Sequence, residues 1–298
     1  MEAKEKQIAA KAALEYLKPD IVLGVGSGST VDHFIHALKS ITFPLKMVAS
    51  SLKTEKALKS LGYEVVSCNS VDRIDLYVDG ADEIDGNFYM IKGGGKALTG
   101  EKILASMSRK FVCIAQKKKK VDFLGNFPVP IEVIPLARSK VAREIVAMGG
   151  NPVYRAGEVT DYGNVLLDVW GWKIDDPRQL EEDLNQIAGV VTNGVFAKQR
   201  ADILILGNVD SPEIYLNASQ IKLVDLTVNR KAQVLKIINL STKEIKRLAD
   251  MGLTIGVEIE VIHRTSFYGP LEIRVRGSNL AISSKIAQGI LVEVKIDK

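Results

Sequence analysis

Residues 21–40, IVLGVGSGSTVDHFIHALKS, decide the fold of this chain. A short apolar run leads into a loop of glycines and serines, and the loop leads into a segment whose apolar residues recur at helical spacing. This order predicts a buried strand, a glycine loop and a helix. Repeated strand–helix units build parallel α/β sheets, and such sheets bind ligands at the carboxyl ends of their strands. The glycine loop lies at such an end.

The same alternation continues for about a hundred residues and predicts a doubly wound, Rossmann-like sheet. From about residue 127 the expected order becomes β-α-β-β-α-β, which is typical of a ferredoxin-like unit. The run at 201–207 returns to the first sheet, so residues 127–200 are an insertion, expected to act as a lid. The expected strands are 45–50, 63–68, 73–80 and 110–116, then 129–135, 152–157, 164–170, 190–196 and 201–207. The expected helices are 1–18, 51–62, 96–108, 137–150 and 176–189.

The last part of the chain changes character. Short strand-like runs separated by turns predict a small β-barrel, with one short helix at 241–252. The predicted domains are therefore residues 1–220 and residues 221–298. The expected strands of the barrel are 231–238, 256–263, 270–277 and 290–296.

The composition indicates an ordinary globular protein, with 298 residues, 46% hydrophobic and 26% charged. The net charge of +4 is not clustered as in nucleic-acid binders, and Lys117–Lys120 is interpreted first as a solvated loop. No apolar run is long enough for a membrane span, and the first helix lacks the apolar centre of a signal peptide. We therefore expect a cytoplasmic protein that binds neither nucleic acid nor membrane. Cys68 and Cys113 are expected to be buried thiols.

The loop GVGSGST at 24–30 favours binding of a small anion. It does not complete the dinucleotide fingerprint, because Ser29 stands where the third glycine belongs, and it lacks the lysine of a P-loop. A glycine loop that opens a helix still offers backbone N–H groups, hydroxyls and the helix dipole to one phosphate. The alternative is a tight structural turn in which Ser29 or Thr30 caps the helix. His33 and His36 follow at helical spacing, but no carboxylate or cysteine accompanies them at the spacing of metal ligands, so a metal site is not favoured.

The segment DGADEIDGNFYMIKGGGKALTGEKI at 79–103 concentrates carboxylates, lysines and glycines. Asp79 follows a predicted strand, and Glu101 lies early in a predicted helix. Together with Lys92 and the free N–H groups of Gly93, Gly94 and Gly95, such residues can remove a proton beside a carbonyl and stabilise the oxyanion.

Each residue of this segment also has a structural interpretation. Glu101 can be a partner of the helix dipole, Asp79 and Asp82 turn formers, and Lys92 a surface lysine; Glu83 and Asp85 are interpreted as solvated charges. The carboxylates do not have the spacing of a calcium loop, so no metal site is predicted.

Residues 1–215 resemble ribose-5-phosphate isomerase of the A type. The motifs that carry the resemblance are GVGSGST (24–30), SSLKTEKALKSLG (50–62), YVDGADEID (77–85), IKGGGKALTGEKI (91–103) and the run from Val121 to Arg155. The resemblance implies interconversion of D-ribose 5-phosphate and D-ribulose 5-phosphate through an enediol(ate) in the pentose phosphate pathway, without a metal or organic cofactor. It also implies a homodimer or homotetramer.

The resemblance also assigns roles to residues. Glu101 is similar to the general base, and Asp79, Asp82 and Lys92 to the groups that assist ring opening and proton shifts. The positions implied to bind substrate are Ser27, Gly28, Ser29, Thr30, Gly80, Ala81, Gly93, Gly94, Gly95, Lys119 and Lys6. Three positions depart from the family's common pattern: Ser27 replaces a threonine, Lys96 a glycine or alanine, and Gln116 an aspartate.

The C-terminal residues 222–298 resemble a different family, the FeoA-type domain, an SH3-like barrel. The resemblance rests on LADMGLTIGVEIEVIHRTSFYGPLEIRVRGSNLAISSKIAQGILVEV at 248–294. Such barrels generally serve protein contacts, so an unknown protein partner is implied; iron binding is not inferred, because the segment has no cysteine and one histidine. A second hypothesis for the whole chain is a sugar-phosphate-sensing regulator coupled to a partner through this barrel. Glu101 together with Lys92 favours the enzyme, because a sensor needs no base.

Overall fold

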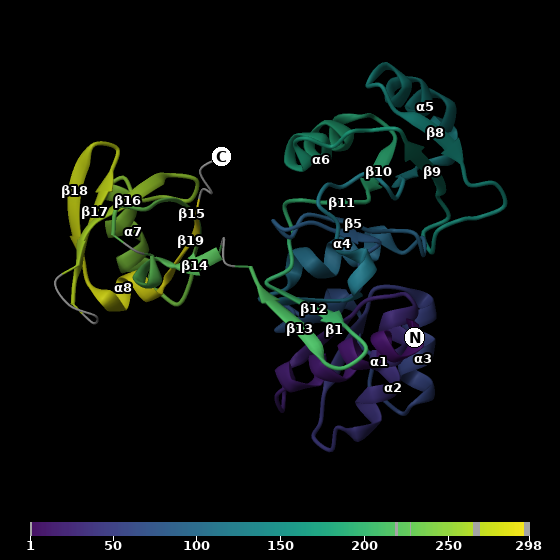
Figure 1. Ribbon diagram of the computed structural model, residues 1–298, viewed down its shortest axis with the longest axis horizontal. Helices are drawn as coiled ribbons and strands as arrows, with labels where there is room; N and C mark the ends of the chain where they lie inside the picture. The colour runs from purple at the N-terminus through teal and green to yellow at the C-terminus, as the bar shows by residue number, and fades with distance from the viewer. Residues whose placement is uncertain (1, 218–219, 227, 265–268, 295–298) are drawn as a thin grey trace. The chain divides into compact units, whose positions relative to one another are not determined.

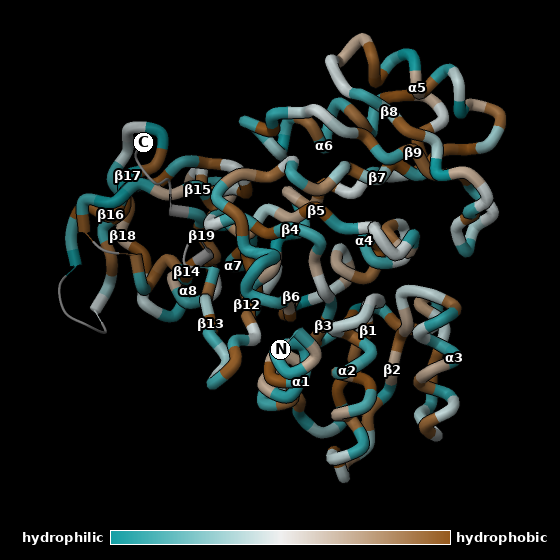
Figure 2. Tube along the Cα trace, turned by 45° about the vertical axis from the view of Figure 1, so that its right-hand side comes forward, coloured by the Kyte–Doolittle hydropathy of each residue, from teal (hydrophilic) through white to brown (hydrophobic). Residues whose placement is uncertain are grey.

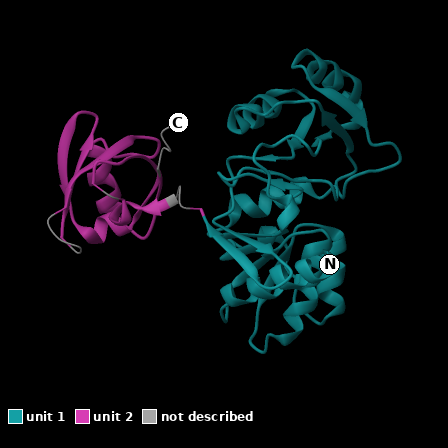
Figure 3. Cartoon of the chain, viewed as in Figure 1, with its two compact units in different colours: residues 1–216 teal, residues 217–298 magenta. Residues whose placement is uncertain are grey.

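The computed structural model describes residues 2–217, 220–226, 228–264 and 269–294. The chain divides into two compact units, residues 1–216 and residues 217–298 (Figure 3). In the described part of the chain, no helix has the length and apolar character needed to cross a membrane.

The first unit is built on a six-stranded sheet with the order β13-β12-β6-β3-β1-β2. All neighbouring pairs are parallel except β12 and β13, which are antiparallel, so the doubly wound sheet is confirmed. The chain runs from β1 outward to β2 and then crosses to β3 on the other side of β1. The crevice between the ends of β1 and β3 is thus the topological switch point, where such sheets bind ligands. The strands are β1 (Val22–Val25), β2 (Lys46–Ala49), β3 (Leu76–Asp79), β6 (Phe111–Gln116), β12 (Ile203–Gly207) and β13 (Pro212–Leu216).

Helices cover both faces of this sheet (Figure 1). One face packs with α1 and α2 around Leu23, Val25 and Phe34, and the other packs with α4 around Tyr77 and Leu104. Helix α3 alternates hydrophilic and hydrophobic residues along its coil, as a surface helix does (Figure 2). The helices are α1 (Glu2–Ala13), α2 (Ser29–Ala37), α3 (Leu52–Ser60) and α4 (Leu98–Met107). Short 3₁₀ turns lie at Leu14–Tyr16, Leu38–Ser40, Cys68–Ser70, Lys117–Lys119, Pro135–Ala137 and Leu223–Asp225.

The insertion forms its own four-stranded sheet with the order β10-β7-β9-β8. The elements occur in the order β-α-β-β-α-β with antiparallel pairing, which is the expected ferredoxin-like arrangement. Between this sheet and the first one lie α4 and a small sheet of β4, β5 and β11 (Figure 1). The elements are β4 (Glu83–Ile84), β5 (Met90–Ile91), β7 (Val129–Val133), α5 (Arg138–Ala147), β8 (Asn151–Tyr154), β9 (Val165–Trp170), α6 (Pro177–Gln186), β10 (Val190–Asn193) and β11 (Val195–Phe196).

The second unit is a six-stranded antiparallel sheet with the order β14-β19-β15-β16-β17-β18. Alternate residues such as Ile259, Val261, Ile273 and Val275 point into its own core. Strands β14 and β18 and helix α8 were not expected, and residues 295–296 of the expected last strand lie outside the described residues. The elements are β14 (Gln220–Lys222), β15 (Lys231–Ile237), α7 (Thr242–Asp250), β16 (Glu258–Arg264), β17 (Leu271–Val275), β18 (Ser278–Ile282), α8 (Ser284–Gln288) and β19 (Ile290–Val294).

Two expected strands of the first unit are wrong in detail. Residues 63–68 pair with the edge strand β2 only through a bridge between Val65 and Met47, and a 3₁₀ turn then begins at Cys68. The run 190–196 breaks at Gly194, where the chain passes from β10 to β11. The Gly194 N–H donates to Pro130 O, and a Cβ there would lie 2.3 Å from Lys92 O. Only a glycine fits this crossing.

The glycines of the first loop make room for the neighbouring strand β3. A Cβ on Gly24 would lie 2.9 Å from the Tyr77 ring, and a Cβ on Gly26 would lie 1.9 Å from the carboxyl carbon of Asp79. Asp79 is fully buried and its carboxylate is fixed by several hydrogen bonds. The loop therefore needs glycine at position 26 so that a buried carboxylate can lie directly beneath it.

We expect Gly26→Ala to destabilise the protein by about 1–3 kcal/mol, because the new methyl group overlaps a carboxylate that cannot move. Gly86→Ala is the matched control, since a Cβ there meets no atom within 4 Å. Urea unfolding of both variants and the wild type measures the difference. Equal midpoints for the two variants would show that the loop yields to Asp79 at no cost.

Candidate active site

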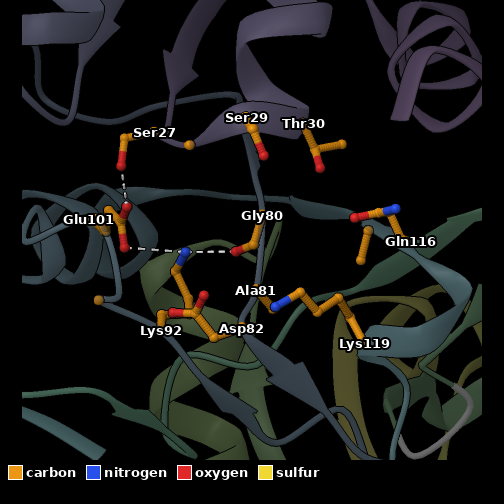
Figure 4. Close-up of a pocket in the computed structure, with 14 residues that line it drawn as sticks. Ser27, Ser29, Thr30, Gly80, Ala81, Asp82, Lys92, Glu101, Gln116 and Lys119 are labelled. Carbon is orange, nitrogen blue, oxygen red and sulfur yellow. Dashed lines mark hydrogen bonds and ion pairs between the residues drawn. The ribbon is translucent and has the colours of Figure 1, made fainter. Parts of the chain in front are cut away.

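A cavity of about 130 Å³ lies at the carboxyl ends of β1, β3 and β6. The glycine loop before α2 forms one wall, and the segment that precedes α4 forms the opposite wall (Figure 4). The lining residues are Ser27, Gly28, Ser29, Thr30, Gly80, Ala81, Asp82, Lys92, Gly93, Gly95, Glu101, Ala115, Gln116 and Lys119.

The charged core of the site is a buried lysine between two carboxylates. Lys92 Nζ lies 2.8 Å from Asp79 Oδ2 and 3.1 Å from Glu101 Oε2, and it donates to Gly80 O at 2.6 Å. All three charged side chains are almost fully buried. Burial opposes the charge of Lys92, but the negative charges of Asp79 and Glu101 outweigh it and raise the pKa of Lys92. Lys92 therefore stays an ammonium and is not the surface lysine of the alternative interpretation.

Asp79 lies behind the cavity and holds Lys92. Its Oδ1 accepts the N–H groups of Ser27 at 3.0 Å and Gly80 at 2.7 Å, and its Oδ2 accepts the Tyr77 hydroxyl in addition to the Lys92 contact. Burial and the charge of Asp79 raise the pKa of Tyr77, so that hydroxyl remains a donor. Because Asp79 does not line the cavity, its carboxylate acts on the site through Lys92 and through the loops that contain Ser27 and Gly80.

Glu101 lies in the first turn of α4 and its carboxylate reaches the cavity. Its Oε1 accepts the Ser27 hydroxyl at 2.5 Å, while Oε2 has only the ion pair with Lys92. Burial, and next the negative charge of Asp79, raise the pKa of Glu101 to about 7, although Lys92 and Ser27 act in the opposite direction. A carboxylate with a pKa near neutrality can both accept and return a proton.

Asp82 and the glycines 93–95 form the wall next to Lys92. The Gly94 N–H donates to Asp82 Oδ2 at 2.8 Å, which directs one oxygen of Asp82 and leaves Gly93 and Gly95 lining the cavity. Gly94 itself lies outside the lining. Lys96, which follows, has a φ of 62° and its Nζ lies 3.6 Å from Glu158 of the insertion. Its ammonium therefore pairs with the insertion, and Lys96 does not line the cavity.

The opposite end of the cavity is suited to an anion. Ser29 and Thr30 are the first residues of α2, whose N-cap is Gly28 with no side-chain capping bond, so the capping interpretation of Ser29 or Thr30 is wrong. Lys119 and Gln116 face these hydroxyls across the cavity (Figure 4). A helix N-terminus with hydroxyls and one lysine is a standard arrangement for a phosphate group.

The lysines of the run 117–120 differ in burial: Lys117 and Lys118 are exposed, and Lys119 is half-buried. Lys117 pairs with Glu213 at 2.8 Å and Lys118 pairs with Glu2, both on the surface, whereas Lys119 alone lines the cavity. Lys6 lies outside the lining, but its Nζ donates to Ser29 Oγ at 2.9 Å. Lys6 thus contacts the anion end through Ser29.

Sequence reasoning missed two lining residues and misjudged two carboxylates. Ala115 and Gln116 close the cavity at the end of β6. Their position at the carboxyl end of a predicted parallel strand is the sequence feature that indicates a place in the site. Glu83 and Asp85 are buried rather than solvated. Glu83 accepts the N–H groups of Gly125 and Phe127, and Asp85 accepts those of Asn87 and Tyr89. Within the described residues, no group of three or more His, Cys, Asp or Glu side chains could hold a metal ion.

Comparison with known proteins agrees with this architecture. Residues 46–211 match the family of ribose 5-phosphate isomerase A (phosphoriboisomerase A), and residues 221–294 match the FeoA domain family. A ribose-5-phosphate isomerase A of Glaesserella parasuis serovar 5 is 54% identical over 211 residues, which are 70% of this chain and 96% of the relative.

Two solved structures are similar to the first unit. Ribose 5-phosphate isomerase A of Neisseria gonorrhoeae is 44% identical with a TM-score of 0.72, covering 73% of this chain and 98% of that one. The enzyme of Methanocaldococcus jannaschii is 33% identical with a TM-score of 0.67, covering 71% and 97%. The chain therefore belongs to the ribose 5-phosphate isomerase A family and carries in addition a C-terminal segment that matches the FeoA domain family.

Proposed function

We propose that the protein interconverts D-ribose 5-phosphate and D-ribulose 5-phosphate, with Glu101 moving a proton between C2 and C1 through an enediol(ate). As a member of the isomerase family, the protein is an isomerase enzyme. The observation that carries the assignment of residues is the buried cluster of Glu101, Lys92 and Asp79 at one end of a cavity whose other end is built for an anion.

The phosphate group would bind first, at the N-terminus of α2. The hydroxyls of Ser29 and Thr30, the first N–H groups of the helix and the Lys119 ammonium surround that end of the cavity. Lys6 holds Ser29 and adds a second positive charge nearby. Binding at this end directs the sugar toward Lys92 and Glu101 at the other end.

Ring opening requires a proton to move between the ring oxygen and the hydroxyl at C1. Asp82 lines the cavity with one oxygen held by Gly94, so its carboxyl group can exchange a proton with the sugar. The Lys92 ammonium is the nearest positive charge for the oxygen atoms at C1 and C2. Asp79 contributes by keeping that ammonium in place.

The isomerisation step is the transfer of a proton from C2 to C1. Glu101 removes the proton at C2, and the electrons move onto the carbonyl oxygen at C1. The Lys92 ammonium and the N–H groups of Gly93 and Gly95 stabilise the enediolate oxygen. The proton of the C2 hydroxyl passes to the C1 oxygen, with Asp82 as the proposed carrier, and this leaves the negative charge on the C2 oxygen. Glu101 then returns its proton to C1 as the C2 carbonyl forms. These side chains and N–H groups provide the proton transfers and the charge stabilisation of the proposed isomerisation, so neither a metal nor an organic cofactor enters the proposal.

The sensor hypothesis is less well supported by the same residues. A protein that only binds a sugar phosphate needs the anion end of the cavity. A carboxylate buried beside another carboxylate costs stability and adds nothing to such binding. The proposal further places the enzyme in the cytoplasm as a homodimer or homotetramer, with a protein partner for the FeoA-like barrel.

The activity is tested by proton NMR of ribose 5-phosphate in heavy water with a chelator and the full-length protein. We expect ribulose 5-phosphate to form with deuterium at C1, because the proton on Glu101 exchanges with solvent during its transfer. The chelator should leave the rate unchanged. An unaltered sugar spectrum with folded protein that still binds the sugar phosphate would instead support the sensor.

Glu101→Gln tests the base. The amide keeps the shape of the side chain but cannot accept the proton, so we expect kcat to fall by about 10²–10⁴-fold with KM within a fewfold of the wild-type value. Steady-state kinetics gives both parameters. A kcat near that of the wild type would remove Glu101 from this role.

Ser27→Ala tests how the pKa of Glu101 is set. The Ser27 hydroxyl donates to the ionised carboxylate and holds its pKa down, so its loss should raise the pKa of Glu101 above about 7. The acid limb of kcat/KM should then move to higher pH than in the wild type. Ser29→Ala, which removes a hydroxyl of the same loop that does not contact Glu101, should leave the limb in place. Equal limbs in all three proteins would contradict the assignment.

A further inference from the structure

Glu132 is a buried carboxylate that the proposed reaction does not use. It lies on β7 of the insertion, is 0% exposed and does not line the cavity. Its Oε2 accepts the Thr99 hydroxyl at 2.5 Å, and its Oε1 accepts the Thr160 hydroxyl at 2.7 Å and the Asn164 amide at 2.8 Å. Burial of a carboxyl group costs free energy unless hydrogen bonds replace those it makes with water, and here three side-chain donors from two parts of the chain converge on one group.

The Thr99 contact crosses from the insertion to the helix that carries the base. Thr99 is the second residue of α4, two residues before Glu101. The first turn of a helix has N–H groups without intrahelical partners and frays most easily. A hydrogen bond from this turn to a fixed carboxylate therefore restrains the backbone position of Glu101.

The other two partners hold Glu132 from the side of the insertion. Thr160 and Asn164 close the turn between β8 and β9, where Thr160 N donates to Asn164 O at 2.9 Å. The same turn is attached to helix α3 of the first unit, because the N–H of Leu52 at the start of α3 donates to Asp161 Oδ2 at 2.8 Å. Glu132 is thus held on both sides, and the Thr99 hydroxyl binds to a rigid acceptor.

A second link holds the other end of the same segment. Arg155, at the end of β8, donates through Nη1 to Gly94 O at 3.2 Å, while Asp168 fixes its guanidinium at 2.8 Å and 2.5 Å. The insertion therefore restrains the chain at Gly94 and at Thr99, on both sides of the turn that leads into α4.

We infer that Glu132 is a positioning residue for the isomerisation, and that it acts through Thr99 to hold the first turn of α4. In that position Glu101 lies 2.5 Å from the Ser27 hydroxyl and 3.1 Å from Lys92. Displacement of a reacting group by about 1 Å can reduce a rate by about 10²-fold, so a small movement of this turn is sufficient to matter. The inference rests on the proposed role of Glu101 as the base.

The alternative is that the Glu132 cluster contributes to folding alone. Loss of any one of its hydrogen bonds would then lower stability and leave the turnover of the folded protein unchanged. Thr99 and Thr160 separate the two cases, because each donates one hydroxyl to Glu132 but only Thr99 belongs to α4. When Thr160 lacks its hydroxyl, the Asn164 amide still holds Glu132 Oε1 and the Thr99 contact is kept.

The test uses the full-length protein with Thr99→Val, Thr99→Ser and Thr160→Val. Valine keeps the size of threonine without its hydroxyl, and serine keeps the hydroxyl. We expect Thr99→Val to lower kcat about 10- to 100-fold with KM for ribose 5-phosphate within threefold, since the anion end is untouched. Thr99→Ser should restore kcat to within threefold of the wild type. Thr160→Val should lower the unfolding midpoint with kcat within threefold.

Thr99→Ala is the second variant without a hydroxyl, in case valine disturbs folding, because alanine is the best helix former. It should show the same loss of kcat. A kcat within twofold of the wild type in either variant lacking the hydroxyl, or an equal loss of kcat in Thr160→Val, would overturn the inference while leaving the isomerase assignment intact. Absence of isomerisation by the wild-type protein would overturn the proposed function and this inference together.

Discussion

A lysine ammonium buried between two carboxylates is the constraint on which the rest of the first unit depends. Charges of this kind are stable in an interior only when their remaining hydrogen-bonding groups are satisfied. Asp79 obtains its donors from Ser27, Gly80 and Tyr77 in addition to Lys92. That requirement brings the ends of β1 and β3 together, and it explains why the loop above Asp79 has no side chain at position 26.

Much of the fold follows from patterns local in sequence. Apolar runs that alternate with amphipathic segments predict the doubly wound sheet, and a change in that rhythm predicts the ferredoxin-like insertion; both are confirmed. The position of Asp79 follows from the rule that parallel strands present their carboxyl ends at one edge of a sheet. Lys92 follows β5 of the small antiparallel sheet and Glu101 lies in α4, so their place beside Asp79 depends on the tertiary structure.

The parts that could not be predicted depend on contacts between distant residues. Glu83 and Asp85 lie in a segment whose composition is typical of a solvated turn. Their burial is possible because backbone N–H groups of the surrounding chain donate hydrogen bonds to both carboxylates. Gly194 breaks an apparently continuous strand because the Lys92 carbonyl lies against it, more than a hundred positions away. Glu132 and Thr99 likewise carry no local signal of their pairing.

These contacts also bear on what the insertion does. The sequence predicts a lid, and a lid that opened as a rigid body would have to break the contacts of Glu132 with Thr99, Arg155 with Gly94 and Asp161 with Leu52. Separation of the first pair would leave a buried carboxylate short of one donor, at a cost of about 1–3 kcal/mol or more. Such a cost disfavours wide opening and favours an insertion that stays closed against α4. In this structure the insertion is a wall against the first turn of α4, and its role as a lid stays a prediction that these three hydrogen bonds oppose.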